Sequence, residues 1–309
     1  MAQVKIFSGT ASHYFAEKVA ASYGTSLGDV TLQKFSDGEM APHFNESVRG
    51  AEVFIIQSTF PPADNLLELM LMVDAAKRAS AHKVVVVMPY YGYARQDRKD
   101  KPRVSIGSKV IANAIQSVGA DRLMTCDLHA GQIQGFFDIP VDHLDGSAIF
   151  VPYLRSLNLG NDLIFASPDV GGVVRTRAFA KNFGAEMVVC DKHRKRANEI
   201  ASMQVIGDVE GMDVVLVDDM VDTAGTMTKA AELLKDKGAK TVRAVATHPL
   251  LSGPAYERIE NSVLEELVVS DTIKLKQPCS KIKVLSFAEL FARAINNVVT
   301  HESISSLFI

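Results

Sequence analysis

Short apolar runs and amphipathic helical patterns alternate along most of the chain. The apolar runs predict strands at 4–7, 53–56, 84–88, 123–126, 163–166, 187–190, 214–217, 242–247, 267–269 and 282–285. Apolar residues three or four positions apart predict helices at 12–23, 65–79, 105–118 and 227–237, with others starting at 147, 172 and 287. Strands that alternate with helices predict an α/β fold of mainly parallel sheets flanked by helices, with ligands at the carboxyl ends of the strands.

The two halves of the chain repeat one pattern. The stretch 52–58, a helix and a strand parallel the stretch 213–219, which is also followed by a helix and a strand. In this alignment Gln57 and Ser58 occupy the positions of two acidic residues, 218 and 219. A chain of 309 residues is also long for one hydrophobic core. We therefore expect two domains, 1–147 and 148–287, with 288–309 as a candidate addition to the first.

Composition narrows the class of protein. The net charge of −3 gives no general attraction to nucleic acid or anionic membranes. No apolar run approaches the ~20 residues of a membrane-spanning helix, and the first residues show no hydrophobic signal region. Cys126, Cys190 and Cys279 are an odd and scattered set, which argues against a disulfide framework and against a zinc site. These features predict a cytoplasmic globular protein.

The most informative stretch is 214–226. Four apolar residues, 214–217, predict a fully buried strand, and Asp218 and Asp219 follow where such a strand would leave its sheet. The small, hydroxyl-rich segment 222–226 comes next and leads into a helix. Free N–H groups at such a turn and helix N-terminus suit a phosphate dianion.

The acid pair requires a different partner, because two carboxylates would repel that phosphate. Vicinal sugar hydroxyls or a magnesium ion would suit them, while Thr223 and Thr226 donate to the phosphate oxygens. A sugar phosphate therefore fits both ends of the motif. The competing interpretation is an ordinary strand-to-helix loop with Asp222 or Thr223 as the N-cap, which leaves two adjacent acids unexplained.

A second ligand loop is predicted at 167–172, between a strand and a helix that carries Arg175. Paired glycines, Gly171 and Gly172, permit a close backbone approach to an anion. Asp169 is a candidate ligand for the magnesium ion that accompanies a diphosphate. A plain glycine turn is the alternative.

Three further segments follow predicted strands. The segment 35–39 follows a strand-like run at 30–34, and its Phe35 is suited to stacking on an adenine, although a charged turn is the simpler interpretation. The basic segment 95–103 is either a nucleotide-phosphate patch or a solvated loop. Asp127 and His129 would face the same side of an extended backbone, as metal ligands or as ordinary structural groups.

A basic segment, 191–196, follows the strand predicted at 187–190. We expect a mobile loop there, which would neutralise charge that develops during phosphoryl transfer. A solvated loop or a nucleic-acid patch are the alternatives, and the net charge disfavours the second. No Gly-x-x-x-x-Gly-Lys-Ser/Thr motif occurs in the chain, which excludes a P-loop kinase.

Together these segments resemble the class I ribose-phosphate diphosphokinases, also called phosphoribosyl diphosphate synthetases. The matching segments are FSDGE at 35–39, YARQDRK at 93–99, DLHAGQIQGFFDIPVDHL at 127–144, SPDVGGVVR at 167–175, DKHRKRAN at 191–198 and VDDMVDTAGT at 217–226. The resemblance implies two phosphoribosyltransferase-like domains. It also implies transfer of the β,γ-diphosphoryl group of ATP to the C1 hydroxyl of ribose 5-phosphate, which yields phosphoribosyl diphosphate and AMP for nucleotide biosynthesis.

The resemblance also implies roles for individual residues. Those matched to ATP binding are Phe35, Asp37, Gly38, Glu39, Arg95 and Gln96. Those matched to Mg²⁺ are His129 and Asp169, and Lys192 and Arg194 match the catalytic cations. Those matched to ribose 5-phosphate are Arg194, Asp218, Asp219, Asp222, Thr223, Ala224, Gly225 and Thr226. The diphosphate loop corresponds to Asp169, Gly171 and Gly172.

Two stretches depart from the family pattern. His193 and Lys195 stand where many members have Arg and Pro, and 101–107 differs from the stretch that helps form the allosteric phosphate and ADP site. Phosphate activation and ADP inhibition therefore stay open, while the family's assembly implies a homohexamer. The alternatives for function are a phosphoribosyltransferase and a catalytically silent, synthetase-associated regulatory subunit.

Overall fold

The computed structural model describes residues 3–160, 162–196 and 199–308, with only the backbone for 192–196 and 199–202. The chain divides into two compact units. The N-terminal unit comprises Met1–Gly146, Thr272–Lys274 and Phe287–Ile309, and the C-terminal unit comprises Ser147–Asp271 and Leu275–Ser286. Within the described residues, every helix is too short or too polar to cross a membrane.

The N-terminal unit is built on a five-stranded sheet in the order β1-β4-β5-β6-β7, in which all pairs are parallel. Its strands are β1 (Val4–Ser8), β4 (Glu52–Ile56), β5 (Lys83–Met88), β6 (Arg122–Cys126) and β7 (Val141–Leu144). Its helices are α1 (His13–Tyr23), α2 (Asp64–Arg78), α3 (Gly107–Ser117) and α8 (Ala288–Thr300), with short 3-10 turns η1 (Thr10–Ser12), η2 (Gly131–Phe136) and η4 (Ser305–Leu307). Helix α8 packs on α1, where the rings of Phe15 and Phe291 meet edge to face.

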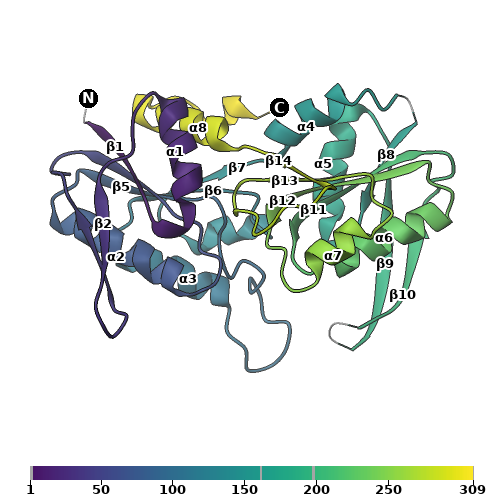
Figure 1. Ribbon diagram of the computed structural model, residues 1–309, viewed down its shortest axis with the longest axis horizontal. Helices are drawn as coiled ribbons and strands as arrows, with labels where there is room; N and C mark the ends of the chain where they lie inside the picture. Colours follow the sequence, from purple (N-terminus) through teal and green to yellow (C-terminus); the bar gives the residue numbers. More distant parts are fainter. Residues whose placement is uncertain (1–2, 161, 197–198, 309) are drawn as a thin grey trace. The chain divides into compact units, whose positions relative to one another are not determined.

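A separate antiparallel hairpin also belongs to this unit (Figure 1). It consists of β2 (Val30–Lys34) and β3 (Met40–Phe44) and packs against α2. Its turn holds the predicted adenine-binding segment.

The C-terminal unit has a seven-stranded sheet in the order β10-β9-β8-β11-β12-β13-β14. Its strands are β8 (Leu163–Ser167), β9 (Met187–Arg196), β10 (Glu199–Ile206), β11 (Asp213–Val221), β12 (Thr241–Pro249), β13 (Leu267–Ser270) and β14 (Ile282–Leu285). Its helices are α4 (Ser147–Ser156), α5 (Val173–Phe183), α6 (Gly225–Asp236) and α7 (Ala255–Glu260), with the 3-10 turn η3 (Val170–Gly172) before α5. Only β10 pairs antiparallel, with β9.

Strand β11 is central in this sheet because helices cover both of its faces. Val214 and Leu216 belong to the cluster that includes α6 and α7, whereas Val215 and Val217 pack with side chains of α4 and α5. All four side chains are buried, which explains why this strand is a continuous apolar run rather than an alternating one.

The two units share one topology. In each, a first strand is followed by a helix and an antiparallel hairpin, and the remaining four strands add in sequence order on one side of the first strand. The hairpin β2–β3 therefore corresponds to β9–β10, and β4 corresponds to β11. The predicted fold class, two mainly parallel α/β sheets flanked by helices, is confirmed.

Candidate active site

Two adjacent carboxylates, Asp218 and Asp219, lie near the carboxyl end of β11. The strand was predicted to stop at 217 but continues to Val221. Its pairing with β8 ends at Leu216, while its pairing with β12 continues to Val221. The acid pair therefore has a strand neighbour on one side only, and the other side lies beyond the end of the paired part of β8. Asp219 is buried and Asp218 is partly exposed.

The two acids interact closely. The backbone N–H of Asp219 donates to Oδ1 of Asp218 at 2.9 Å, and Nη1 of Arg175 donates to Oδ1 of Asp219 at 3.2 Å. Burial, and then the charge of Asp219, raise the pKa of Asp218 well above its ordinary 3.8, and Arg175 opposes this shift. Carboxylates held in this way are stabilised by hydrogen-bond donors, which sugar hydroxyls supply.

The turn after β11 has a backbone conformation that the sequence did not predict. Ala224 has a positive φ of 60° and is the N-cap of α6. Its methyl group cannot accept a hydrogen bond, so it leaves the first N–H groups of α6 to other acceptors. Nη1 of Arg258, from α7, donates to the carbonyl oxygen of Thr223 at 3.0 Å and ties the turn to α7.

The backbone around this turn is supported by the loop after β12. The N–H of Leu251 donates to the carbonyl oxygen of Val221 at 3.0 Å, and that of Ser252 donates to Asp222 at 2.8 Å. Thr223 is exposed, whereas Gly225 and Thr226 are partly exposed. The predicted phosphate segment is thus a fixed turn at the start of a helix, a geometry that binds anions in many proteins.

The loop 167–172 is a compact turn. The carboxylate of Asp169 accepts a hydrogen bond from the N–H of Gly172 at 3.2 Å, and the hydroxyl of Ser167 donates to the carbonyl oxygen of Asp169 at 2.6 Å. A Cβ atom at Gly172 would lie 2.7 Å from the Ser167 hydroxyl. A side chain at position 172 would therefore require the Ser167 hydroxyl to move. Gly171 beside it is exposed.

The basic segment that we expected to be a loop continues strand β9 as far as Arg196. It pairs with β10, with Lys192 opposite Met203 and Arg194 opposite Ile200. Together β9 and β10 form an extended hairpin (Figure 1). The side chains of Lys192 and Arg194 lie outside the described part of the chain. The expectation of a loop was wrong because backbone pairing with β10, not burial of side chains, makes this stretch a strand.

In the N-terminal unit, the predicted ATP-binding segment is the tight turn of the β2–β3 hairpin. Phe35 donates its N–H to Glu39 at 2.9 Å, and the carboxylate of Asp37 accepts from the N–H of Glu39 at 3.0 Å. Gly38 has φ +98°, which a residue with a side chain rarely adopts. Half of the Phe35 surface is exposed, so its ring is available to an aromatic ligand.

Arg95 and Gln96 lie in the turns that follow β5, and both are exposed. The carbonyl oxygen of Gln96 accepts a hydrogen bond from the N–H of Ser108 at 3.2 Å, which ties this segment to the start of α3. The segment is therefore held to the start of α3, while its basic residues are exposed.

A shared face for Asp127 and His129 depended on an extended backbone, and Asp127 has φ +38°, so the backbone at that residue is not extended. A carboxylate oxygen of Asp127 instead accepts from the N–H of Gly146 at 3.0 Å, while His129 is exposed. The described residues contain no cluster of three or more His, Cys, Asp or Glu side chains that would hold a metal ion by themselves.

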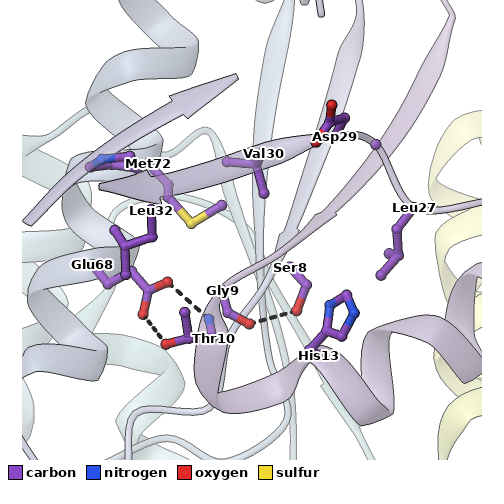
Figure 2. Close-up of a pocket in the computed structure, with 12 residues that line it drawn as sticks. Ser8, Gly9, Thr10, His13, Leu27, Asp29, Val30, Leu32, Glu68 and Met72 are labelled. Atoms are coloured by element: carbon purple, nitrogen blue, oxygen red, sulfur yellow. Dashed lines mark hydrogen bonds between the residues drawn. The ribbon is translucent and has the colours of Figure 1, made fainter. Parts of the chain in front are cut away.

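A cavity of about 350 Å³ lies in the N-terminal unit, at the carboxyl end of β1 (Figure 2). The turn after β1, the hairpin and α2 form its walls, and no described candidate residue lines it. Glu68 on α2 accepts two hydrogen bonds from Thr10, from the N–H at 2.9 Å and from the hydroxyl at 2.7 Å. By topology this turn corresponds to the loop 167–172 of the other unit.

Gln57 and Ser58, at the positions of the acid pair, also bond within the protein. Gln57 is buried and accepts from the N–H of Ala11 at 3.2 Å, while its amide donates to Glu68 at 3.0 Å. The hydroxyl of Ser58 donates to the carbonyl oxygen of Thr272 at 2.8 Å. Side chains of the protein thus bond to one another and to the backbone at the positions that correspond to the acid pair.

Comparisons with known proteins place the chain in a family. Residues 4–119 match the N-terminal domain of ribose phosphate pyrophosphokinase, and residues 184–309 match the phosphoribosyl synthetase-associated domain. The ribose-phosphate pyrophosphokinase of Porphyromonas gingivalis is 55% identical over 303 residues, which cover 98% of this chain and 97% of that protein. That of Wolinella succinogenes is 55% identical over 306 residues, which cover 99% of both.

A solved structure agrees with these relatives. The crystal structure of phosphoribosylpyrophosphate synthetase from Mycobacterium smegmatis superposes with a TM-score of 0.92 at 36% identity, over 97% of this chain and 99% of that one. The duplicated parallel topology thus defines a two-domain protein of the phosphoribosyltransferase-like fold class. Within that class, the chain belongs to the ribose-phosphate pyrophosphokinase family.

Proposed function

We propose that this chain is a ribose-phosphate diphosphokinase, which transfers the β,γ-diphosphoryl group of ATP to the C1 hydroxyl of ribose 5-phosphate. The products are phosphoribosyl diphosphate, a precursor for nucleotide biosynthesis, and AMP. The observation that carries the proposal is the sequence of features along β11. Two adjacent acids lie on β11 just beyond the end of its pairing with β8, and a turn then leads into the N-terminus of α6.

The C-terminal unit takes the sugar phosphate. Asp218 and Asp219 accept hydrogen bonds from the ribose hydroxyls, while the turn 222–226 receives the 5-phosphate through N–H and hydroxyl donors. The exposed backbone of Gly171 beside Gly172 lets a diphosphate approach the loop 167–172 closely.

The N-terminal unit takes ATP. The exposed ring of Phe35 stacks on adenine, with Asp37, Gly38 and Glu39 beside it on the hairpin turn. Arg95 and Gln96 bind from the turns after β5. The resemblance further supports a homohexamer in which a neighbouring subunit contributes to this site, and light scattering after size-exclusion chromatography would give the mass of the assembly.

Magnesium fits the residues present. Mg²⁺ usually takes one or two protein ligands together with substrate phosphates, and the described residues offer isolated candidates, His129 and Asp169, rather than a closed cage. One oxygen of Asp169 bonds to the N–H of Gly172, and a carboxylate has lone pairs enough for a second partner. When bound, the ion would draw charge from the phosphate oxygens.

Lys192 and Arg194 neutralise the charge that develops as the diphosphoryl group moves, and Arg194 also contacts the sugar phosphate. Phosphoryl transfer depends mainly on in-line positioning and on electrostatic stabilisation, so a strong general base is not required. We place the reaction in the cytoplasm, because all three cysteines are thiols, as is usual in a reducing compartment.

A ³¹P NMR time course with ATP, Mg²⁺ and ribose 5-phosphate tests the proposal. The expected result is loss of ATP with equal growth of AMP and phosphoribosyl diphosphate, and no change when ribose 5-phosphate is omitted. Formation of ADP instead of AMP, or no turnover, would contradict it. A parallel sample with phosphoribosyl diphosphate and adenine would detect a phosphoribosyltransferase, and an inactive chain would match a regulatory subunit.

A further inference from the structure

Arg175 connects the loop 167–172 to the acid pair on β11. It lies in the first turn of α5, which follows η3 directly, and α5 packs against β8 and β11. Its Nη1 atom donates to Oδ1 of Asp219 at 3.2 Å, with 21% of the Arg175 side chain and 5% of the Asp219 side chain exposed. The contact is therefore largely shielded from water.

The two acids are joined to each other as well. The N–H of Asp219 donates to Oδ1 of Asp218 at 2.9 Å, which links the backbone of one residue to the carboxylate of the other. Asp169 adds a third negative charge in the same neighbourhood. Without a cation, repulsion among these carboxylates would turn the Asp219 side chain away from the place where it meets a substrate. A guanidinium is suited to prevent this, because its planar donors fix a carboxylate in orientation as well as in charge.

We propose that Arg175 is a positioning residue for ribose binding, which fixes the carboxylate of Asp219 through Nη1 before the sugar arrives. The inference rests on the proposed function, since it assigns Arg175 to the pentose side of that reaction. This role differs from one in which Arg175 only stabilises the fold. Loss of a positioning residue would weaken the binding of ribose 5-phosphate selectively.

Steady-state kinetics of Arg175→Met and Arg175→Lys measure the effect. A hydrogen bond to a charged group supports a change of about tenfold or more. We therefore expect Arg175→Met to raise the KM for ribose 5-phosphate by at least that factor, with the KM for ATP changed by less than about twofold. Arg175→Lys, which keeps the charge but not the planar fork, should recover part of the loss.

The matched control is Arg177→Met. Arg177 lies on the same helix and is exposed, so its replacement removes the same charge and length without touching the acid pair. We expect parent-like KM values from it. If Arg177→Met raises the KM for ribose 5-phosphate as much as Arg175→Met does, the effect is one of general charge and the proposal fails.

A double-mutant cycle separates action through Asp219 from an independent contact. If Arg175 acts through Asp219, then Arg175→Met adds little to Asp219→Asn, and the double variant stays within about threefold of Asp219→Asn alone. Additive losses in KM for ribose 5-phosphate would show that Arg175 acts by another route and would overturn the proposal. So would equal increases in both KM values.

Calorimetric titration of ribose 5-phosphate into the parent and Arg175→Met keeps this inference separate from the proposed reaction. A parent that binds the sugar phosphate but forms no AMP would refute the reaction alone, and Arg175 would still be tested by the ratio of the two dissociation constants. A ratio near one would refute the role of Arg175. If Arg175→Met does not fold, the same ratio is taken from Arg175→Lys.

Discussion

The carboxylate of Glu68 accepts both the backbone N–H and the hydroxyl of Thr10, at 2.9 Å and 2.7 Å. This pair lies in the N-terminal unit at the turn that corresponds to the loop 167–172 of the C-terminal unit. A glutamate in that position takes the donors that an anionic ligand would otherwise use, and its charge would repel such a ligand (Figure 2). In the N-terminal copy of the shared topology, side chains of the protein thus fill this turn, whereas we propose that the corresponding turn of the C-terminal copy receives an anion.

Replacement of Glu68 by alanine is expected to destabilise the protein rather than to open a binding site. The change removes the acceptor of Thr10 and of the buried Gln57 amide, and leaving such donors without a partner costs about 1–3 kcal/mol. Urea unfolding of Glu68→Ala and of Glu232→Ala, on the exposed face of α6, checks this. Equal unfolding midpoints for the two variants would contradict it.

The sequence predicted the interior strands of both sheets, because a strand that is buried on both faces consists of consecutive apolar residues. It also predicted the apolar edge strands β1 and β14, but it missed β3, β7 and β10. Each of these lies at an edge, β7 and β10 at the ends of the two large sheets and β3 in the two-stranded hairpin. An edge strand is held by backbone hydrogen bonds on one side and tolerates polar residues. Pro42 in β3 and Asp142 in β7 interrupt the apolar pattern, so hydrophobicity alone does not predict these strands.

The candidate site likewise has one part that the sequence predicts and another part that it does not. Asp218, Asp219 and the turn after them could be predicted because they are contiguous in the sequence and follow one apolar run. The contact between Arg175 and Asp219 joins residues 44 positions apart, and that between Arg258 and Thr223 joins residues 35 apart. Such pairs depend on the packing of α5 and α7 on the sheet, which local sequence does not encode.

Replacement of Gly172 by alanine should disturb the loop 167–172 selectively. A Cβ atom there would lie 2.7 Å from the hydroxyl of Ser167, which would displace the hydrogen bond from Ser167 to the carbonyl oxygen of Asp169. Overpacking of this kind costs about 1–3 kcal/mol, and a shifted loop should lower kcat/KM by about tenfold or more. Gly135→Ala is the control, because nothing lies within 4 Å of a Cβ atom at that position. Parent-like rates and stability for Gly172→Ala would refute the tight packing.

Replacement of Asp218 by asparagine should stabilise the ligand-free protein while it impairs turnover. Burial raises the pKa of Asp218 in the folded protein, so the unfolded chain loses this proton at a lower pH than the folded one. Stability therefore falls as pH rises from about the ordinary value of 3.8 through the raised pKa, and the loss is complete above it. Asparagine carries no such charge, so the gain should be present at pH 7 and shrink toward pH 4.

Urea unfolding at both pH values measures that difference, and initial rates with ribose 5-phosphate measure the cost to activity, which we expect to be about tenfold or more in kcat/KM. Asp236→Asn, at the exposed end of α6, serves as the control for loss of one negative charge. A variant Asp218→Asn that is less stable than the parent at pH 7 would show that burial of this carboxylate is compensated in the free protein.

Lys192 on β9 gives the sharpest test of the proposed chemistry. If its ammonium group stabilises charge on the moving diphosphoryl group, Lys192→Ala should lower kcat by about 10²- to 10³-fold, because that interaction is strongest in the transition state. The dissociation constant of ribose 5-phosphate should change by less than about threefold, because Lys192 would stabilise the transition state and not the bound ground state. Single-turnover rates and calorimetric titration measure the two quantities, and Lys181→Ala, an exposed lysine near the end of α5, is the matched control. Equal turnover in Lys192→Ala and the parent would remove Lys192 from the mechanism, whereas a loss of sugar-phosphate affinity with unchanged kcat would reassign it to ground-state binding.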